Sequence, residues 1–321
     1  MTILVVGDAN ADLSAAVPRF PAEGDDRPIA ALNWGSGGSG ANVATALALL
    51  GTHPRLLARV GTDPASEVAL RAASGASVDL GLIQRDETVA TGLCFAAIST
   101  GGERTFFSYR GANVNLQPAA GPSLLAEARW LHVSAHALLE GPQRATALAL
   151  IEDAGRRGVP VSLDLCLPLL RDRRAEVLDL LPRLRILFAN EQEFATLLPG
   201  LSIDAALEQL SGTGPALIAL KRGACGCEIA AAGRRWSLPA FAVAAIDSNG
   251  CGDAFGAGFI HAHTQGASPE DSATLGNALG ALTATRAGSA DALPDRAELR
   301  AFLAERGESA IARLSLIIDS S

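Results

Sequence analysis

A glycine-rich turn that leads into a helical pattern is the segment of this sequence best suited to chemistry. It reads Gly250-Cys251-Gly252-Asp253, and apolar positions at helical spacing follow it. The first N–H groups of a helix lack intrahelical partners and carry partial positive charge, so the turn predicts a binding site for an anion such as a phosphate. Asp253 falls in the first turn of the helix. There it can accept a proton or merely complement the dipole, and we expect it to stay ionised at pH 7.

A second glycine-rich segment, residues 35–42, precedes a predicted helix. Three of its glycines match the Gly-x-Gly-x-x-Gly pattern of a dinucleotide-binding loop. Such a loop follows the first strand directly, whereas here the first strand ends at Gly7, far upstream. The spacing therefore argues against an NAD-dependent dehydrogenase, and the glycines are better explained by close approach of the backbone to a polar ligand.

Three polar side chains suit a ligand with several hydroxyl groups. Asn10 and Asp12 follow the first strand two positions apart, so an extended backbone directs both to one side. Asn42, at the end of the second glycine segment, offers donors and an acceptor. Together they predict a diol or sugar site, and a simple turn or cap is the alternative for Asn10 and Asp12.

The composition excludes several functional classes. The chain has 321 residues, 49% of them hydrophobic, which suffices for a large core. A net charge of −8 without a basic run argues against a nucleic-acid partner. Lys221 is the only lysine, so the chain has no Gly-x-x-x-x-Gly-Lys-Ser/Thr phosphate loop. Five widely spaced cysteines predict neither a disulfide framework nor, at Cys225 and Cys227, a zinc site.

The apolar stretches are too short to cross a membrane, and the N-terminal residues do not resemble a signal peptide. These features predict a soluble cytoplasmic protein without a membrane partner.

Short apolar runs alternate with helical patterns along the chain, which predicts an α/β fold with a mainly parallel sheet and helices on both faces. Two segments break the alternation, residues 11–34 and a predicted hairpin at residues 91–110, and we expect them to form a small β-sheet lid. We interpret residues 1–321 as one domain that carries this lid. The predicted strands are 3–6, 56–60, 130–133, 159–163, 186–188 and 216–220. The predicted helices are 41–50, 64–73, 143–157, 174–181, 191–198, 204–210, 253–264, 269–286 and 296–305.

Both glycine segments, in this order, resemble the two signatures of the PfkB/ribokinase family of carbohydrate kinases. The first reads Gly37-Gly38-Ser39-Gly40-Ala41-Asn42-Val43-Ala44, with Gly51 and Gly61 at the expected spacings. The second, residues 247–260, is similar to Asp-Thr-Thr-Gly-Ala-Gly-Asp but departs from it at Ser248, Asn249 and Cys251. An Asn-x-x-Glu element lies between them, and the resemblance covers essentially the whole chain. It implies a ribokinase-like three-layer α/β/α sandwich with a β-lid, and ATP-dependent phosphorylation of a sugar hydroxymethyl group.

The resemblance also implies roles for individual residues. Asp253 is the catalytic base, and the backbone N–H groups of Gly250, Cys251, Gly252 and Asp253 hold the γ-phosphate. Asn190 and Glu193 position Mg²⁺ through water. The substrate positions are Asn10, Asp12, Gly38, Ser39, Asn42, Arg110 and Glu140. The ATP positions are Asn190, Lys221, Gly223, Gly226 and Asn277. Asp247, Asn249, Thr283, Arg286 and Gly288 correspond to loops that bind a monovalent cation such as K⁺, mostly through carbonyl oxygens.

The identity of the acceptor stays open at this point. Ser39 stands where ribokinases usually carry lysine, so a pentose, a ketohexose, a sugar acid and a nucleoside all remain candidates. A nucleoside would need aromatic side chains to stack on its base, which Trp34, Phe106 and Tyr109 of the lid segments could supply. A non-catalytic sugar- or nucleotide-binding protein is the alternative outside the kinases. The apolar lid strands also predict a homodimer that forms through the lids.

Overall fold

An eight-stranded sheet forms the middle of the protein. The computed structural model describes residues 2–101, 103–118, 124–306 and 314. The strand order is β14-β13-β12-β11-β10-β9-β1-β4. The strands from β12 to β4 are parallel, whereas β13 and β14 add an antiparallel hairpin at one edge. The bounds are β1 Thr2–Val6, β4 His53–Leu57, β9 Trp130–Ser134, β10 Val161–Asp164, β11 Ile186–Asn190, β12 Leu217–Lys221, β13 Cys227–Ala231 and β14 Arg234–Leu238.

Helices cover both faces of this sheet because alternate side chains of each strand point to opposite sides. In β1, Ile3 and Val5 belong to one buried core, and Leu4 and Val6 belong to the other. The first core includes α1 (Ser39–Leu49), α2 (Ala65–Gly75), α7 (Cys251–Thr264), α8 (Pro269–Ala284) and α9 (Arg296–Ala304). The second includes α3 (Gly141–Arg157), α4 (Leu167–Leu180), α5 (Glu191–Leu197) and α6 (Ile203–Leu210). The predicted three-layer sandwich is thereby confirmed.

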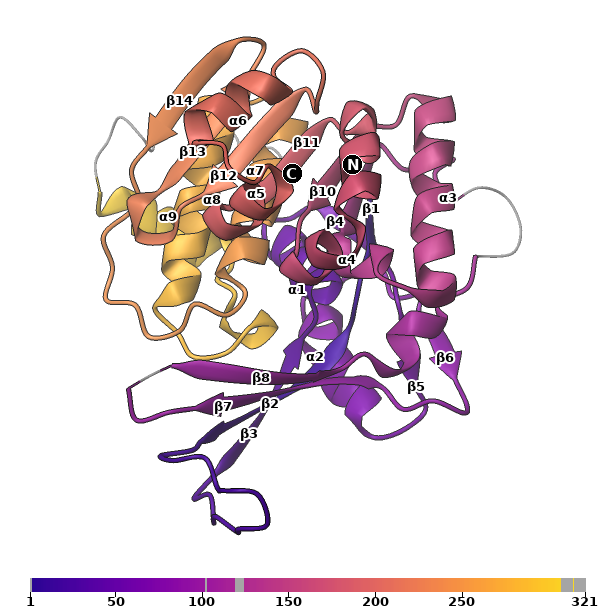
Figure 1. The fold of residues 1–321 in the computed structure, drawn as a ribbon, viewed down its shortest axis with the longest axis vertical. Helices are drawn as coiled ribbons and strands as arrows, with labels where there is room; N and C mark the ends of the chain where they lie inside the picture. The colour runs from indigo at the N-terminus through magenta and orange to yellow at the C-terminus, as the bar shows by residue number, and fades with distance from the viewer. Residues whose placement is uncertain (1, 102, 119–123, 307–313, 315–321) are drawn as a thin grey trace.

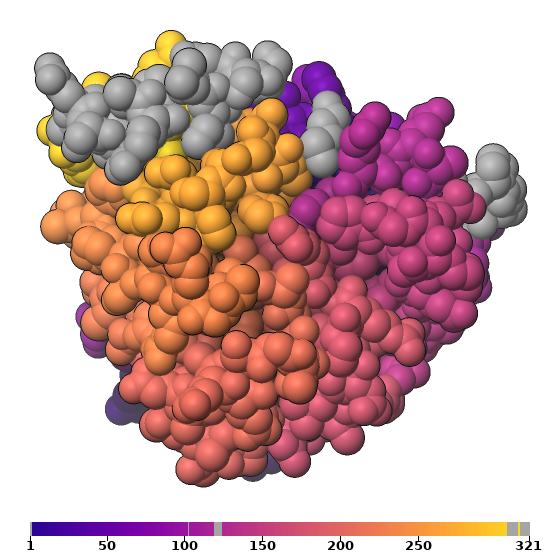
Figure 2. Space-filling view, turned by 90° about the horizontal axis from the view of Figure 1, so that it is seen from above, coloured from indigo at the N-terminus to yellow at the C-terminus, as the bar shows by residue number. Residues whose placement is uncertain are grey.

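A smaller four-stranded sheet lies across the end of the body at which the parallel strands finish (Figure 1). Its order is β3-β2-β7-β8. The strands β7 and β8 lie within residues 91–110, whereas β2 begins one residue before the predicted segment 11–34 and β3 extends three residues beyond it. The bounds are β2 Asn10–Ala16, β3 Leu32–Gly37, β7 Gly92–Ile98 and β8 Arg104–Tyr109. Only three residues separate β1 from β2, so the first strand of the body leads almost directly into the lid. The view from above shows the indigo N-terminal segments only at the margins of the body (Figure 2).

The elements differ from the expectations in three places. The strand predicted at 56–60 is divided, because β4 ends at Leu57 and Arg59–Gly61 forms β5, which pairs with β6 (Gln84–Asp86) in a separate sheet. The helix predicted at 174–181 is the second part of α4 (Leu167–Leu180), which the non-helical Arg173 divides, and the first part of α4 was not predicted. The hairpin of β13 and β14 was not predicted. No helix within the described residues has the length and apolarity needed to cross a membrane.

Candidate active site

A cavity of about 1080 Å³ lies between the lid and the carboxyl ends of the parallel strands. Residues far apart in the sequence meet there because both glycine segments and both lid segments contribute to its walls. Of the predicted site residues, the cavity is lined by Asn10, Asp12, Gly38, Ser39, Asn42, Arg110, Asp247, Asn249, Gly250, Asp253 and Gly288.

The predicted anion-binding turn has the expected backbone form. Gly250 adopts φ 74°, a left-handed conformation that favours glycine, and α7 begins at the next residue. The first intrahelical bond runs from Ala254 N–H to the Gly250 carbonyl at 2.8 Å, so the amides of Gly252 and Asp253 precede the helical ladder. The Cys251 amide differs from the prediction because it donates to the Ser248 carbonyl at 3.3 Å.

Asp253 is held by the other glycine segment. The Asn42 side-chain amide donates to Asp253 Oδ2 at 2.7 Å and to Ser289 Oγ at 2.8 Å. Burial, with the carboxylate of Asp164, raises the pKa of Asp253 to about 7, although the bond from Asn42 and the charge of Lys221 act in the other direction. The expectation of a fully ionised group at pH 7 was therefore wrong, because desolvation outweighs the favourable helix dipole.

The single lysine of the chain lies beside this turn. Lys221, at the end of β12, donates from Nζ to both carboxylate oxygens of Asp164 at 2.6 and 2.8 Å. A Cβ atom placed on Gly252 would lie only 3.3 Å from Lys221 Nζ. Burial alone would lower the pKa of Lys221, but Asp164 and Glu193 raise it above its ordinary value, so the ammonium group stays charged.

Asn190 and Glu193 hold each other at the start of α5. Asn190 Oδ1 accepts from the Glu193 amide, and Glu193 Oε2 accepts from the Asn190 amide, both at 2.8 Å. Burial raises the pKa of Glu193 to about 7, against the opposing charge of Lys221. The element is therefore a rigid capping box whose carboxylate lies in the field of the Lys221–Asp164 pair.

The residues predicted to bind a substrate bring polar groups with fixed positions to the cavity. Asn10 Oδ1 accepts from Asn113 Nδ2 at 2.8 Å. Burial and the nearby Asp291 raise the pKa of Asp12 to about 7. Gly38 has φ 88°, and a Cβ atom there would lie 2.5 Å from the Asp8 carbonyl oxygen, so this glycine lets two backbone segments meet. Ser39 Oγ contacts Ser134 Oγ, which leaves a neutral wall at this position.

Arg110 and Glu140 have different surroundings. Arg110 Nη2 donates to Asp8 Oδ1 at 3.0 Å and to Gln143 Oε1 at 2.6 Å, and its Nε is buried without a partner among the described residues. Glu140 does not line the cavity. It occupies the N-cap position of α3 without a side-chain capping bond, its side chain is 57% exposed, and its Oε1 lies 3.6 Å from Arg110 Nη1.

Comparison with known proteins agrees with this geometry. Residues 2–296 match the pfkB family carbohydrate kinase model. The chain belongs to this family. It is 33% identical over 304 residues to an ATP-dependent ribose-1-phosphate kinase of Halopiger xanaduensis (95% of this chain, 98% of the relative) and 31% identical over 318 residues to a fructokinase of Klebsiella pneumoniae (94% and 99%). A fructokinase from Vibrio cholerae O395, crystallised with fructose, ADP and potassium ion, has a TM-score of 0.79 at 27% identity (94% and 98%). The protein is thus an ATP-dependent carbohydrate kinase, a phosphotransferase with an alcohol acceptor.

The predicted ATP residues of this carbohydrate kinase lie outside the cavity. Gly223 has φ 54° and open space beside it. A Cβ atom on Gly226 would lie 2.0 Å from the Leu238 carbonyl oxygen, so this glycine permits close packing against β14. The Asn277 side-chain amide donates to the Pro239 carbonyl at 3.1 Å and holds that loop on α8.

Two predicted cation residues of the kinase direct their side chains elsewhere. Thr283 Oγ1 donates to the Leu279 carbonyl at 2.8 Å inside the core, and Arg286 pairs with Glu298 at 2.6 Å. The structure does not bring these two side chains to the cavity.

Several residues of the site were missed by the sequence reasoning. Asp164 ends β10 at the same edge as Lys221, so its place at a strand end was the available signal. Four further residues line the cavity without any local pattern to mark them: Asp8, Arg104, Ser289 and Asp291.

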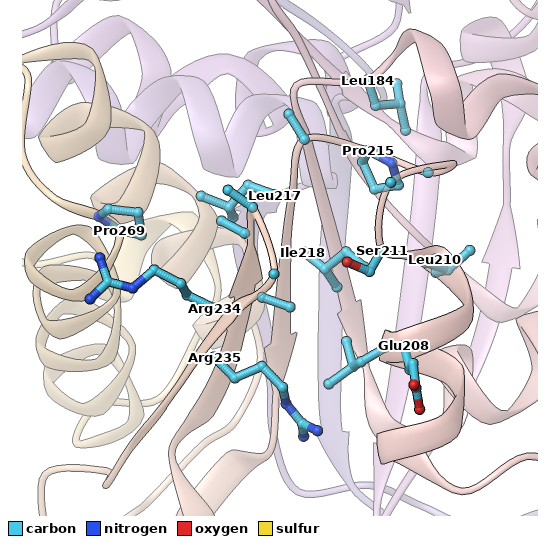
Figure 3. A pocket seen from close by; sticks show the side chains of 18 of the residues that line it. Leu184, Glu208, Leu210, Ser211, Pro215, Leu217, Ile218, Arg234, Arg235 and Pro269 are labelled. Atoms are coloured by element: carbon cyan, nitrogen blue, oxygen red, sulfur yellow. The ribbon is translucent and has the colours of Figure 1, made fainter.

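A second pocket of about 730 Å³ lies at the opposite end of β12, near the start of that strand (Figure 3). Leu184, Leu210, Pro215 and Leu217 supply apolar walls, with Arg234 and Arg235 at the hairpin. It contains none of the predicted site residues.

Proposed function

We propose that the protein transfers the γ-phosphate of ATP to a hydroxymethyl group of a small carbohydrate, with Asp253 as the base. The observation that carries this proposal is the position of Asp253, which lies in the first turn of α7, accepts a bond from Asn42 and faces the polar cavity. A carboxylate with a pKa near 7 can accept the hydroxyl proton as the bond to phosphorus forms. Phosphoryl transfer depends more on positioning and charge stabilisation than on a strong base.

The amides of the turn and Lys221 have complementary roles in this proposal. The amides of Gly252 and Asp253, at the positive end of α7, would hold the oxygens of the γ-phosphate. Lys221 Nζ lies close enough to Gly252 to add a full positive charge beside them. Asp164 keeps this ammonium group in place and charged.

The residues of the Asn190–Glu193 element fit a hydrated Mg²⁺ ion. No cluster of three or more His, Cys, Asp or Glu within the described ranges could enclose a metal, so contact through water is the arrangement that suits this chain. A dication would favour the ionised form of the buried Glu193, whose pKa burial has raised. When bound, Mg²⁺ neutralises charge on the phosphates.

For the acceptor, we propose a pentose, a ketohexose or a sugar acid. Asn10, Asp12 and Asn42 present carboxylate and amide groups to the cavity, and Asn42 Oδ1 is buried without a partner within the described part of the chain. An unpaired buried acceptor is costly, and a substrate hydroxyl would satisfy it. The neutral contact of Ser39 with Ser134 gives no preference for ribose.

A nucleoside is the second candidate because aromatic side chains line the lid side of the cavity. Trp34, Phe106 and Tyr109 all line it, and each is about half exposed, at 49, 50 and 52%. Large exposed rings beside a polar cavity are suited to stacking on a base.

We also infer a homodimer that forms through the lids. Phe107, which is 56% exposed, does not line the cavity and stacks on Phe95 with ring centroids 6.1 Å apart. Neighbouring strand residues face opposite sides, so these rings lie on the face of the lid away from the cavity, where a second copy would cover them.

A coupled assay of ADP release tests the proposed function. ATP and Mg²⁺ are supplied with pentoses, hexoses, sugar acids or nucleosides in separate reactions. We expect ADP formation that depends on a sugar. If no acceptor raises ADP formation above the sugar-free rate while sugars still raise the melting temperature, the protein is a binding protein and the proposal is wrong.

A further inference from the structure

A lid arginine is paired with the loop that precedes the anion-binding turn. Arg104 begins β8, and its Nη2 lies 2.9 Å from Asp247 Oδ1. The two side chains are largely buried, with 17% and 7% of their surfaces exposed. The pair therefore connects the lid to the chain that leads into Gly250.

Asp247 accepts two further hydrogen bonds, one on each oxygen of its carboxylate. Oδ1 also accepts from the Asn249 amide at 2.8 Å, and Oδ2 accepts from the Gly288 amide at 3.0 Å. The carboxylate thus ties together the turn before α7 and the loop after α8, and Arg104 neutralises its charge.

These contacts do not fit a monovalent cation. Asp247, Asn249 and Gly288 are three of the five positions where the family resemblance implies K⁺, yet the carboxylate among them already has a guanidinium partner. A second cation beside Asp247 would be repelled by Arg104.

The charge of Arg104 also extends to the turn itself. Burial, together with the charges of Asp247 and Asp253, raises the pKa of the Cys251 thiol to about 11. The positive charge of Arg104 acts in the other direction. Cys251 is the first residue of α7, so the guanidinium lies near enough to act on the helix start that would receive the phosphate.

We propose that Arg104 supplies, from the lid, the positive charge beside Asp247 that a monovalent cation would otherwise provide, so that turnover does not require K⁺. Arg104 is a positioning residue in this proposal, because it acts through Asp247 on the turn that holds the phosphate. The inference rests on the proposed function of that turn. It also couples the position of the lid to the geometry of the anion site, because the bond exists only while β8 lies over the loop.

The first test compares turnover with and without KCl at constant ionic strength, with tetramethylammonium chloride as the replacement at about 100 mM. We expect the kcat of the wild type to change by less than about two-fold, and that of Arg104→Met to fall by about ten-fold or more with a smaller change in KM. Arg104→Lys should retain most of the turnover. K⁺ or millimolar guanidinium ion should restore part of the kcat of Arg104→Met. Arg235→Met, which removes the ion pairs with Asp204 and Glu228 at the far hairpin, is the matched control and should behave as the wild type.

The second test needs no acceptor and so separates this inference from the proposed function. Thermal unfolding is measured in KCl and in tetramethylammonium chloride. We expect no stabilisation specific to K⁺ in the wild type and a K⁺-specific stabilisation of Arg104→Met. A wild type that K⁺ specifically stabilises or activates several-fold, or an Arg104→Met variant with full turnover in the absence of K⁺, would overturn the proposal.

Discussion

The Asn42 side-chain amide donates a 2.7 Å hydrogen bond to Asp253 Oδ2, although the two residues lie 211 positions apart in the chain. Asn42 belongs to α1 and Asp253 to the first turn of α7, so this bond joins the two glycine segments across the cavity. It favours the ionised form of Asp253, while burial and Asp164 favour the protonated form. The balance leaves a carboxyl group that can both accept and release a proton near neutral pH.

Asp253→Asn should lower kcat by about 100-fold or more, because the amide cannot accept the hydroxyl proton. The variant should stay folded. Folding raises the pKa of Asp253, so the protein loses stability as the pH rises through about 7 and this buried group ionises. The uncharged asparagine side chain of the variant avoids that loss. ADP release and thermal unfolding at pH 8 check both statements. Near-normal turnover would remove Asp253 from the mechanism.

The pH dependence of kcat/KM should reveal the same group. Only ionised Asp253 accepts a proton, so activity should fall as the pH is lowered through about 7. Asp12 has a pKa of about 7 in the same cavity, and Asp12→Asn identifies its share of the profile. We expect the fall below pH 7 to persist in Asp12→Asn. A profile that stays flat down to pH 5.5 in both proteins would contradict the assignment of the base.

The parts of the site that the sequence could predict are local. Gly250 and Asp253 belong to one continuous segment at the start of α7, so their proximity follows from the sequence. Asn10 and Asp12 share one side of β2 because alternate side chains of an extended strand point the same way. The layers of the fold followed from buried strands alternating with helices. The unpredicted β13–β14 hairpin turns at Ala232 and Gly233, which have φ 48° and 73°; the glycine was a signal, but alanine stands where Asn, Asp or Gly usually marks such a turn.

The parts that the sequence could not predict are contacts between distant segments. Lys221 ends β12 and Asp164 ends β10, the two strands that flank β11, and the residues are 57 positions apart, so their pairing depends on the strand order of the sheet. The pairing of Arg104 with Asp247 depends on where the lid lies over the body. The raised pKa of Asp253 in α7 also depends on distant segments, because it reflects burial and the carboxylate of Asp164 at the end of β10.

Lys221→Met should lower kcat more than it raises the KM for ATP, because the ammonium group is proposed to act on the phosphate during transfer. It should also destabilise the protein by about 3 kcal/mol, because Asp164 would keep a largely buried charge without a partner. Changing both residues, Lys221→Met with Asp164→Leu, should recover stability without recovering turnover. Denaturant unfolding and ADP release measure the two effects separately. Recovery of turnover in the double variant would show that Lys221 has only a structural role.

The lid dimer gives the last prediction. Phe107→Glu places a charge on the exposed ring position that stacks on Phe95, where a second copy would have to desolvate it. Light scattering at about 50 µM should give the mass of two chains for the wild type and of one chain for this variant. Leu201→Glu changes an apolar side chain with 40% exposure outside the lid and is the control, which should stay dimeric. Because the cavity is roofed by the same lid strands, we expect the monomeric variant to show a higher KM for the sugar and a smaller change in the KM for ATP. A wild type with the mass of one chain, or a dimer that Phe107→Glu leaves intact, would show that the lids do not form the interface.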